Sequence, residues 1–263
     1  MQTFADLYRY RFILSNLVAK NLKVLYRNMA LGFLWSLLNP LVLVVVLTVV
    51  WVLFFGQTID FALKVLVTLI PYNLFTYCIS GCTTAIRDNA NLVKRVAFPR
   101  QILPVSVVLT HLVQFPVQFS LVLLGLAILP HPGSALSVHL LWIIPIFVIQ
   151  IGLCLGSGFL VAALNVRYRD VRYVVDSLLV VLFWLCPVLY VARDRLATES
   201  IWLQVAYFLN PMSGILEGYR DVLFFGRSPE LLSLGLAFAV TTVIGIVGVR
   251  TFWVQEKHFA DLV

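Results

Sequence analysis

The stretch RDNANLVKRVAFPRQILP, residues 87–104, lies between two long apolar runs in a sequence that otherwise carries few charges. Basic loops of membrane proteins remain on the cytoplasmic side, so this polar segment predicts the orientation of the apolar runs on either side of it. It also offers a surface on which a partner protein could act. The charged residues that interrupt the apolar sequence here are Arg87, Asp88, Lys94, Arg95 and Arg100.

The composition decides the class of protein. Of the 263 residues, 61% are hydrophobic and 12% are charged, whereas about 25% are charged in a typical soluble domain. This balance excludes a water-soluble enzyme. The net charge of +7 comes from basic residues in short clusters between apolar runs, which is typical of membrane topology signals and not of nucleic-acid-binding surfaces. We therefore expect a multi-pass membrane protein that does not bind nucleic acid.

Six apolar runs are predicted to cross the membrane, because about 20 apolar residues in a helix span the hydrocarbon core. The fifth run is short for a helix that spans alone, so we expect it to begin a turn earlier, at residue 173. In the fourth run, Gly152 and Gly156 have the spacing of a small-residue contact between membrane helices. The predicted spans are residues 31–55, 65–86, 102–129, 138–164, 173–192 and 231–249.

Residues 1–30 are predicted to form an amphipathic helix that lies on the cytoplasmic membrane surface, ahead of a transmembrane domain of residues 31–263. Anionic lipid headgroups would attract its basic face, which makes membrane lipids an expected partner. A basic tail without fixed structure is the alternative. The residues that recur along the polar face are Arg9, Asn16, Lys20, Lys23 and Arg27.

Residues 196–225 leave two topologies open. If this region crosses the membrane, the chain has seven spans and its C-terminus lies outside; if it enters and returns, the chain has six. Counting Lys and Arg on the inner side does not separate the two. Asn210-Pro211 and Gly214 favour re-entry, because broken backbone is tolerated at membrane depth where protein or water satisfies it. The expected fold is an all-α polytopic membrane protein with six transmembrane helices, an N-terminal amphipathic helix and a re-entrant helix pair before the last span.

The sequence lacks the residues that would make the chain an enzyme. It contains no GxxxxGK[ST] phosphate loop, and its apolar runs contain no cluster of carboxylates or histidines for acid-base chemistry or metal binding. We therefore expect no catalytic residue, no metal site and no cofactor in this chain. Neither disulfides nor zinc ligation is implied by the cysteines, which all lie in apolar runs: Cys78, Cys82, Cys154 and Cys186.

Several segments, together with the N-terminal amphipathic helix, resemble the permease subunits of type-2 ABC exporters of polysaccharides. The resemblance covers nearly the whole chain and is strongest to O-antigen permeases, with capsule and teichoic acid permeases as relatives. The segments are GFLWSLLNPL (32–41), NLVKRVAFPRQILP (91–104), LNVRYRDV (164–171), NPM (210–212) and EGYRDVLF (217–224).

The resemblance implies half of a transporter in the bacterial inner membrane, with both termini in the cytoplasm. Two copies would form the channel, and two separate ABC subunits would use ATP and Mg to drive a lipid-linked polysaccharide outward from the cytoplasmic side. A capsule, teichoic acid or small lipophilic compound as cargo is the alternative. A membrane scaffold that transports nothing is a further one.

The resemblance also implies a coupling helix within residues 87–101 that sits on the ATPase subunit. Phe98 and Pro99 would anchor the turn back into the membrane, because proline restricts its own backbone and that of the preceding residue. Alternatively, the basic residues act only as topology signals and headgroup contacts. The polar residues placed at this interface are Asp88, Asn91, Lys94, Arg95 and Arg100.

The second basic loop, NVRYRDVR, has two possible uses. Arg167, Arg169 and Asp170 could form an ionic clasp within the chain. Alternatively, Arg167, Arg169 and Arg172 could bind a lipid pyrophosphate at the cytoplasmic mouth, because guanidinium groups match phosphate geometry.

Aromatic residues are 13% of the chain, and a sugar polymer could slide over their apolar faces. Most aromatic side chains of membrane helices are interface anchors or packing residues, which is the alternative for each of them. The channel candidates are Trp35, Tyr72, Phe75, Tyr77, Trp184 and Tyr190.

Overall fold

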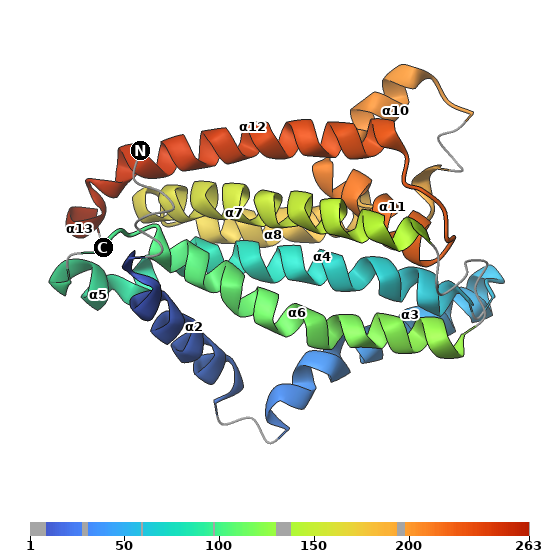
Figure 1. The fold of residues 1–263 in the computed structure, drawn as a ribbon, viewed down its shortest axis with the longest axis horizontal. Helices are drawn as coiled ribbons and strands as arrows, with labels where there is room; N and C mark the ends of the chain where they lie inside the picture. Colours follow the sequence, from blue (N-terminus) through green and yellow to red (C-terminus); the bar gives the residue numbers. More distant parts are fainter. Residues whose placement is uncertain are drawn as a thin grey trace.

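The computed structural model describes residues 9–27, 31–58, 60–96, 98–129, 138–193 and 198–262, in which every regular element is a helix (Figure 1). The expected all-α class is therefore confirmed. In chain order the elements are α2 (Arg11–Tyr26), η1 (Gly32–Leu34), α3 (Trp35–Phe55), α4 (Asp60–Thr84), η2 (Arg87–Asn89), α5 (Ala90–Arg95), α6 (Ile102–Ile128), η3 (Val138–Trp142), α7 (Ile143–Arg167), α8 (Val171–Leu185), α10 (Ile201–Phe208), α11 (Pro211–Leu223), α12 (Leu231–Glu256) and α13 (Phe259–Leu262).

Five helical segments within the described ranges are long and apolar enough to cross a membrane: α3, α4, α6, the continuous η3–α7 segment and α12. Helix α8 has 15 residues, which is shorter than the about 20 that a single spanning helix needs. The fifth apolar run was expected to be helical to residue 192, but α8 ends at Leu185 and residues 186–190 form a turn and a bend.

Two other helices extend beyond their apolar runs. Helix α4 begins at Asp60, five positions before the expected start at 65, because Asp60 and Lys64 form an ion pair one helical turn apart at 2.8 Å. Helix α12 continues past 249 to Glu256. Hydropathy detects only the part of a helix that suits hydrocarbon, so polar turns at either end are missed.

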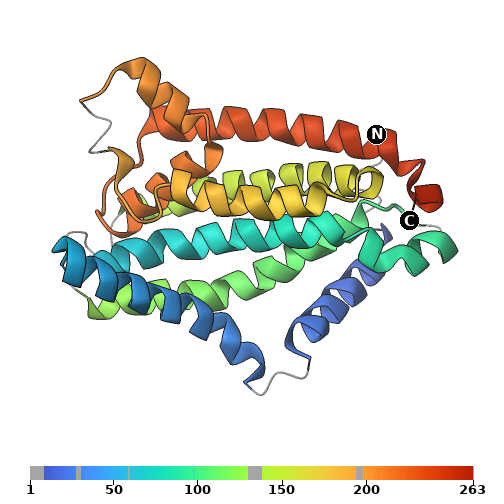
Figure 2. The same cartoon turned by 180° about the vertical axis from the view of Figure 1, so that it is seen from behind.

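The long helices run roughly along one axis of the molecule, and its two ends differ (Figures 1 and 2). One end, which we call the α5 end, holds α5, α13, the start of α2, the end of α7 and the start of α8. The other, the α10 end, holds α10 and α11. The basic loops at 87–100 and 167–172 therefore lie at the same end.

Helix α4 forms the centre of the bundle. In its most apolar 18-residue stretch 72% of the residues are buried, against 11% in the corresponding stretch of α3. Helices α3 and α8 instead leave long apolar faces uncovered in a single chain. In water such faces would mark an interface, and in a membrane they meet lipid or another protein. The exposed large side chains are Val42, Leu43, Val45, Val46, Val49, Val50, Leu53, Phe54 and Phe55 of α3, and Tyr173, Val174, Leu178, Val180, Val181, Trp184 and Leu185 of α8.

Helices α7 and α12 pack closely through glycine. A Cβ atom at Gly156 would lie 2.7 Å from the Cα atom of Gly245, and one at Gly248 would overlap the carbonyl oxygen of Gly156. At Gly152 a Cβ atom would meet the Thr241 methyl group at 3.3 Å. The small-residue contact predicted from Gly152 and Gly156 is confirmed, with α12 as its partner. Close backbone approach of this kind holds membrane helices together by van der Waals contact.

Helices α10 and α11 both lie at the α10 end, where α8 ends and α12 begins (Figure 1). Asn210 caps α11 by accepting a hydrogen bond from the Met212 N–H at 3.2 Å, and Pro211 is the first helical residue. The Asn-Pro pair therefore starts a helix and does not interrupt one. All of α11 is buried, and a Cβ atom at Gly214 would lie 2.5 Å from the Ser233 carbonyl oxygen of α12.

Replacement of Gly248 by alanine tests the contact between α7 and α12. The new methyl group would push against the backbone at Gly156, so we expect a loss of about 1–3 kcal/mol. Gly245→Ala is the matched control, because its Cβ atom would meet nothing within 4 Å. Thermal unfolding in detergent, followed by tryptophan fluorescence, should show a lower midpoint for Gly248→Ala alone. Equal midpoints for both variants would contradict this packing.

Candidate functional site

The candidate site is a short helical hairpin between α4 and α6, which we call the α5 hairpin (residues 87–96 and 98–101). Helix α5 has only six residues, and at Val96 the backbone becomes extended with φ −123° and ψ 130°. Pro99 follows in the turn that leads into α6. A proline has no backbone N–H, has a fixed φ angle and disfavours helical backbone in the residue before it, so the hairpin ends in a stiff joint.

The α5 hairpin presents one polar face and one apolar face. Asp88, Asn91, Lys94 and Arg95 are all exposed; Asp88 lies in η2, while in α5 Lys94 and Arg95 follow Asn91 by three and four residues, which puts them beside it on the helix surface. Phe98 lies on the other side and is buried. Pro99 and Arg100 are half-buried in the turn. Of the polar residues that the sequence predicts as an interface, the structure thus leaves Asp88, Asn91, Lys94 and Arg95 exposed, whereas Arg100 lies half-buried in the turn with Pro99.

A second apolar cluster supports the hairpin from beneath, separate from the main core of the bundle. Val93 and Phe98 enter it from the hairpin. The other buried members come from five different helices: Leu17 of α2, Ile102 and Leu103 of α6, Ala162, Ala163 and Val166 of α7, Phe252 of α12 and Phe259 of α13, with Ala85 and Ile86 just ahead of the hairpin. The hairpin is therefore seated on the transmembrane bundle and moves with it.

Three polar ties join the hairpin to its supports. Lys20 of α2 donates to the Asn89 side-chain oxygen at 2.6 Å. Arg87 donates to the Val166 carbonyl oxygen at the end of α7 at 3.3 Å. The backbone N–H of Arg100 donates to Glu256 Oε1 at 2.9 Å. Lys20 was expected only on the membrane-facing polar side of the N-terminal helix, and no role was predicted for Asn89 or Glu256.

Helix α2 is held against α6 by side chains in its last two turns. Asn21 donates to Ser106 Oγ at 3.4 Å, and Gln114 donates to the Tyr26 hydroxyl oxygen. Burial raises the pKa of the Tyr26 hydroxyl, so it remains neutral at physiological pH. The N-terminal helix therefore packs on the bundle as well as presenting its outer side to its surroundings.

The second basic loop is exposed throughout the segment that contains Arg167, Arg169, Asp170 and Arg172. Among the described residues, the loop's Arg172 forms an ion pair with Asp176 at 4.0 Å, and both side chains are largely exposed. Asp170 forms no ion pair with another described residue. Exposed pairs of this kind contribute about 0–1 kcal/mol. The loop therefore leaves its guanidinium groups available to an anionic ligand at the α5 end.

The six aromatic channel candidates do not share one environment. Trp35, Trp184 and Tyr190 are exposed, whereas Tyr72 and Phe75 are buried in the main core and Tyr77 is half-buried against the His111 ring. The Tyr72 hydroxyl donates to the Leu179 carbonyl oxygen at 2.5 Å, and its ring meets the edge of Phe183. Within one chain, Tyr72 thus fastens α8 to α4.

At the α10 end the segment EGYRD, residues 217–221, forms a buried ionic cluster that had no predicted role. Glu217 accepts from the Ala192 N–H at 2.7 Å and from Arg220 at 2.9 Å. Arg220 also donates to the carbonyl oxygens of Pro187 and Val188. Asp221 pairs with Arg193 at 2.7 Å and Arg227 at 2.6 Å. Three charged residues within five positions, Glu217, Arg220 and Asp221, were the sequence signal for this cluster.

Within the described part of the chain, no group of three or more histidine, cysteine or acidic side chains could hold a metal ion. The four cysteines are free and buried. The candidate site therefore consists of charged, amide and apolar side chains, with the exposed second basic loop beside it at the α5 end.

Replacement of Arg220 by methionine tests the buried cluster. It would leave the Glu217 carboxylate buried without its cation, which costs about 3–5 kcal/mol in comparable cases. Arg193→Met is the control, because Arg193 is partly exposed and Asp221 would keep Arg227. Abundance in the membrane and the unfolding midpoint in detergent should both fall far more for Arg220→Met. Similar losses for the two variants would contradict the assignment.

Comparison with known proteins agrees with this geometry. The family model of ABC-2 type transporters matches residues 14–224. An O-antigen export system permease protein RfbA of Myxococcus xanthus is 33% identical over 258 residues, which cover 97% of each chain. Two proteins of the same name from Klebsiella pneumoniae are 25% and 26% identical over 245 residues, 92% of each chain. The chain belongs to the ABC-2 type transporter family.

Proposed function

We propose that this chain is the membrane permease half of an ATP-driven ABC exporter that moves a lipid-linked polysaccharide of the O-antigen type from the cytoplasmic side across the bacterial inner membrane. The names of its relatives support the cargo. The observation that carries the mechanism is the exposed polar face of the α5 hairpin, seated on several helices in a chain without a phosphate loop. Such a chain needs an external source of work, and this face is where a partner can apply it.

The proposed topology has six spans, a re-entrant pair formed by α10 and α11, and both termini in the cytoplasm. The basic loops gather at the α5 end, which supports a cytoplasmic position for that end. Helix α8 would cross together with the turn that follows it. Non-helical backbone is tolerated at membrane depth when protein satisfies it, and the Val188 carbonyl accepts from Thr68 at 3.0 Å and from Arg220.

The proposed assembly contains two copies of this chain and two ABC subunits, which bind ATP and Mg in place of any cofactor in this chain. The uncovered apolar faces of α3 and α8 suit contact with a second copy and with lipid. Trp35, Trp184 and Tyr190 lie exposed on or beside these helices, where a sugar polymer could slide past them. Tyr72, Phe75 and Tyr77 would support that wall from behind.

The ABC subunit would bind Asp88, Asn91, Lys94 and Arg95, while the turn at Phe98, Pro99 and Arg100 transmits its movement to α6. Arg167, Arg169 and Arg172 would bind the pyrophosphate of the lipid carrier at the same end. Guanidinium groups form paired hydrogen bonds with phosphate oxygens, so these residues would orient the lipid end of the cargo at the entrance.

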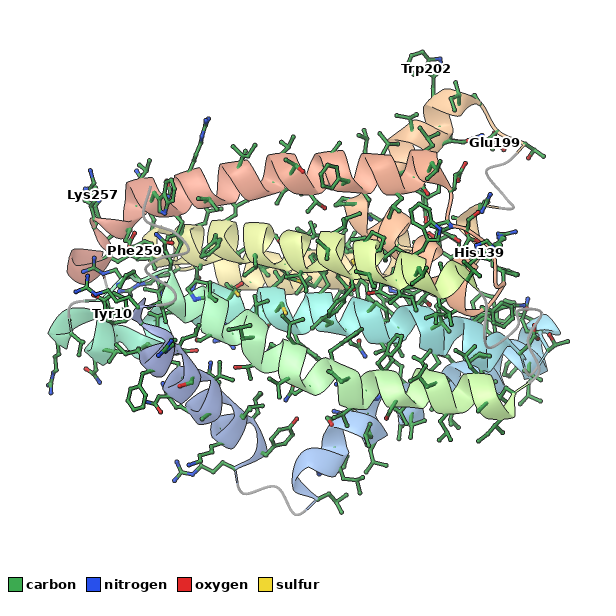
Figure 3. All side chains as sticks on the ribbon, in the orientation of Figure 1. Tyr10, His139, Glu199, Trp202, Lys257 and Phe259 are labelled. Carbon is green, nitrogen blue, oxygen red and sulfur yellow. The ribbon has the colours of Figure 1, made fainter. Side chains whose placement is uncertain are left out.

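Reversing charge on the α5 hairpin tests the partner surface. The double variant Lys94→Glu with Arg95→Glu should lower co-purification of the ABC subunit about tenfold or more, because like charges placed across an interface cost several kcal/mol. Lys257→Glu is the control, an exposed lysine at the same end of the molecule (Figure 3). Undiminished co-purification of the double variant at normal abundance would refute this docking surface.

Replacing Arg167 and Arg169 together by alanine tests the anion-binding loop. We expect surface polysaccharide to fall at least several-fold while the ABC subunit still co-purifies, because the loop binds cargo and not the partner. Lysine at both positions should restore only part of the export, since an ammonium group lacks the planar fork. Export at the wild-type level from the alanine variant would eliminate the pyrophosphate role.

In a strain without this gene, polymer that accumulates in the cytoplasm would favour a polymer over a small lipophilic cargo.

A further inference from the structure

The carboxylate of Glu256 joins two parts of the chain that lie 156 residues apart. Glu256 is the last residue of α12, and its Oε1 atom accepts a hydrogen bond from the backbone N–H of Arg100 at 2.9 Å. Arg100 lies in the turn that leaves the α5 hairpin and enters α6, which begins at Ile102. The contact therefore sits at the joint through which the hairpin meets the transmembrane bundle.

Physical chemistry favours a carboxylate at this position. The N–H groups of Ile102 and Leu103 already donate to the carbonyl oxygens of Pro99 and Arg100, so the N–H group left for Glu256 in this turn is that of Arg100, next to a helix N-terminus that carries partial positive charge. Gln101, the N-cap residue of α6, makes no capping hydrogen bond with its side chain. Glu256 supplies an acceptor for this turn from a different helix. A hydrogen bond to an ionised carboxylate is stronger than one between neutral groups, so this link resists separation.

Apolar packing reinforces the same junction. Phe252 of α12 and Phe259 of α13 are both fully buried, with ring centroids 5.2 Å apart in an edge-to-face arrangement. They share the second apolar cluster with Val93 and Phe98 of the hairpin. Figure 3 shows Phe259 at the α5 end, close to the start of α2 at Tyr10. The end of α12 is thus attached to the hairpin by a hydrogen bond on one side and by aromatic rings on the other.

The opposite end of α12 is attached just as closely to α11. The Gly214 position of α11 lies against the Ser233 carbonyl oxygen in the first turn of α12, where a side chain would not fit. Between these ends, glycine contacts hold α12 against α7. Its 26 residues make a rod of about 39 Å at about 1.5 Å per residue. Close-packed helices shift as bodies and do not deform continuously, so a displacement at one end reaches the other.

We propose that Glu256 is a positioning residue that ties the α5 hairpin to α12, so that movement of the hairpin is delivered along α12 to α11 at the far end of the molecule. The inference rests on the proposed function in one respect, that a partner acts on the α5 hairpin. Energy from the partner then reaches the α10 end by a direct route through α12, in addition to the covalent route through α6.

Three variants separate this role from simple support of the fold. Glu256→Ala removes the acceptor, Glu256→Gln keeps a neutral acceptor, and Lys257→Ala changes the next, exposed residue of the same segment (Figure 3). The wild-type chain is purified from its own host with the ABC subunit that accompanies it. ATP hydrolysis is measured on the complex, and surface-exposed lipid-linked polysaccharide on complemented cells of a strain lacking the gene.

We expect the ABC subunit to co-purify with all three variants, because none alters the exposed face of α5. For Glu256→Ala, polysaccharide exported per ATP hydrolysed should fall about tenfold, the effect of losing one charge-assisted hydrogen bond worth about 1.4 kcal/mol. Glu256→Gln should lie between Glu256→Ala and wild type, since its amide oxygen still accepts but without the negative charge, and Lys257→Ala should match wild type. An unchanged ratio in Glu256→Ala, or an equal loss in the glutamine variant, would overturn the proposal.

Residue-resolved hydrogen exchange of the wild-type complex supplies a test that does not need a mutant to fold. The Arg100 amide should exchange slowly, and ATP binding should change protection in residues 211–223. Rapid exchange at Arg100 would overturn the proposal, even if Glu256→Ala fails to accumulate. Absence of any ABC subunit from the wild-type preparation would instead refute the proposed function, while the Arg100 amide would still report on the tie itself.

Discussion

The structure depends on the requirement that backbone polar groups in hydrocarbon be satisfied by the protein itself. Regular helices meet it locally, but this chain breaks helical structure after α8 and starts a buried helix at Pro211. The carbonyl oxygens of Pro187 and Val188 accept hydrogen bonds from Arg220, and Val188 also accepts from Thr68. Arg220 is balanced in turn by Glu217. The ionic cluster is thus the condition under which irregular backbone can lie inside the bundle.

The two ends of the molecule also differ in how their charged side chains are placed. At the α10 end the charges of the ionic cluster are paired within the protein, as for Asp221, which is buried between Arg193 and Arg227. At the α5 end the charges of the hairpin and of the second basic loop point outward. Buried pairs hold a structure in one arrangement, whereas exposed charges remain available to partners and ligands. One end is therefore built for support and the other for contact.

Much of this architecture follows from local sequence. Apolar run length predicts the long apolar helices, and the polar segment between two of these runs predicts a surface that a partner could reach. The ties between Lys20 and Asn89 and between Arg100 and Glu256 join residues 69 and 156 positions apart, so no local pattern reveals them. The burial of Tyr72 could not be predicted either. The local sequence of an aromatic side chain in an apolar helix does not tell whether it faces a channel, lipid or a neighbouring helix.

Within one chain, helix α8 is held by few contacts. Its inner face is short, with Val175 and Leu179 as its buried residues, and its outer face is a row of large apolar side chains. The Tyr72 hydroxyl group holds its middle to α4, and the Arg220 contacts hold the turn at its end. A helix attached at a few points can shift at a lower free-energy cost than one embedded in the core. The ionic cluster can therefore set the position of the end of α8, because Arg220 holds the turn that follows it.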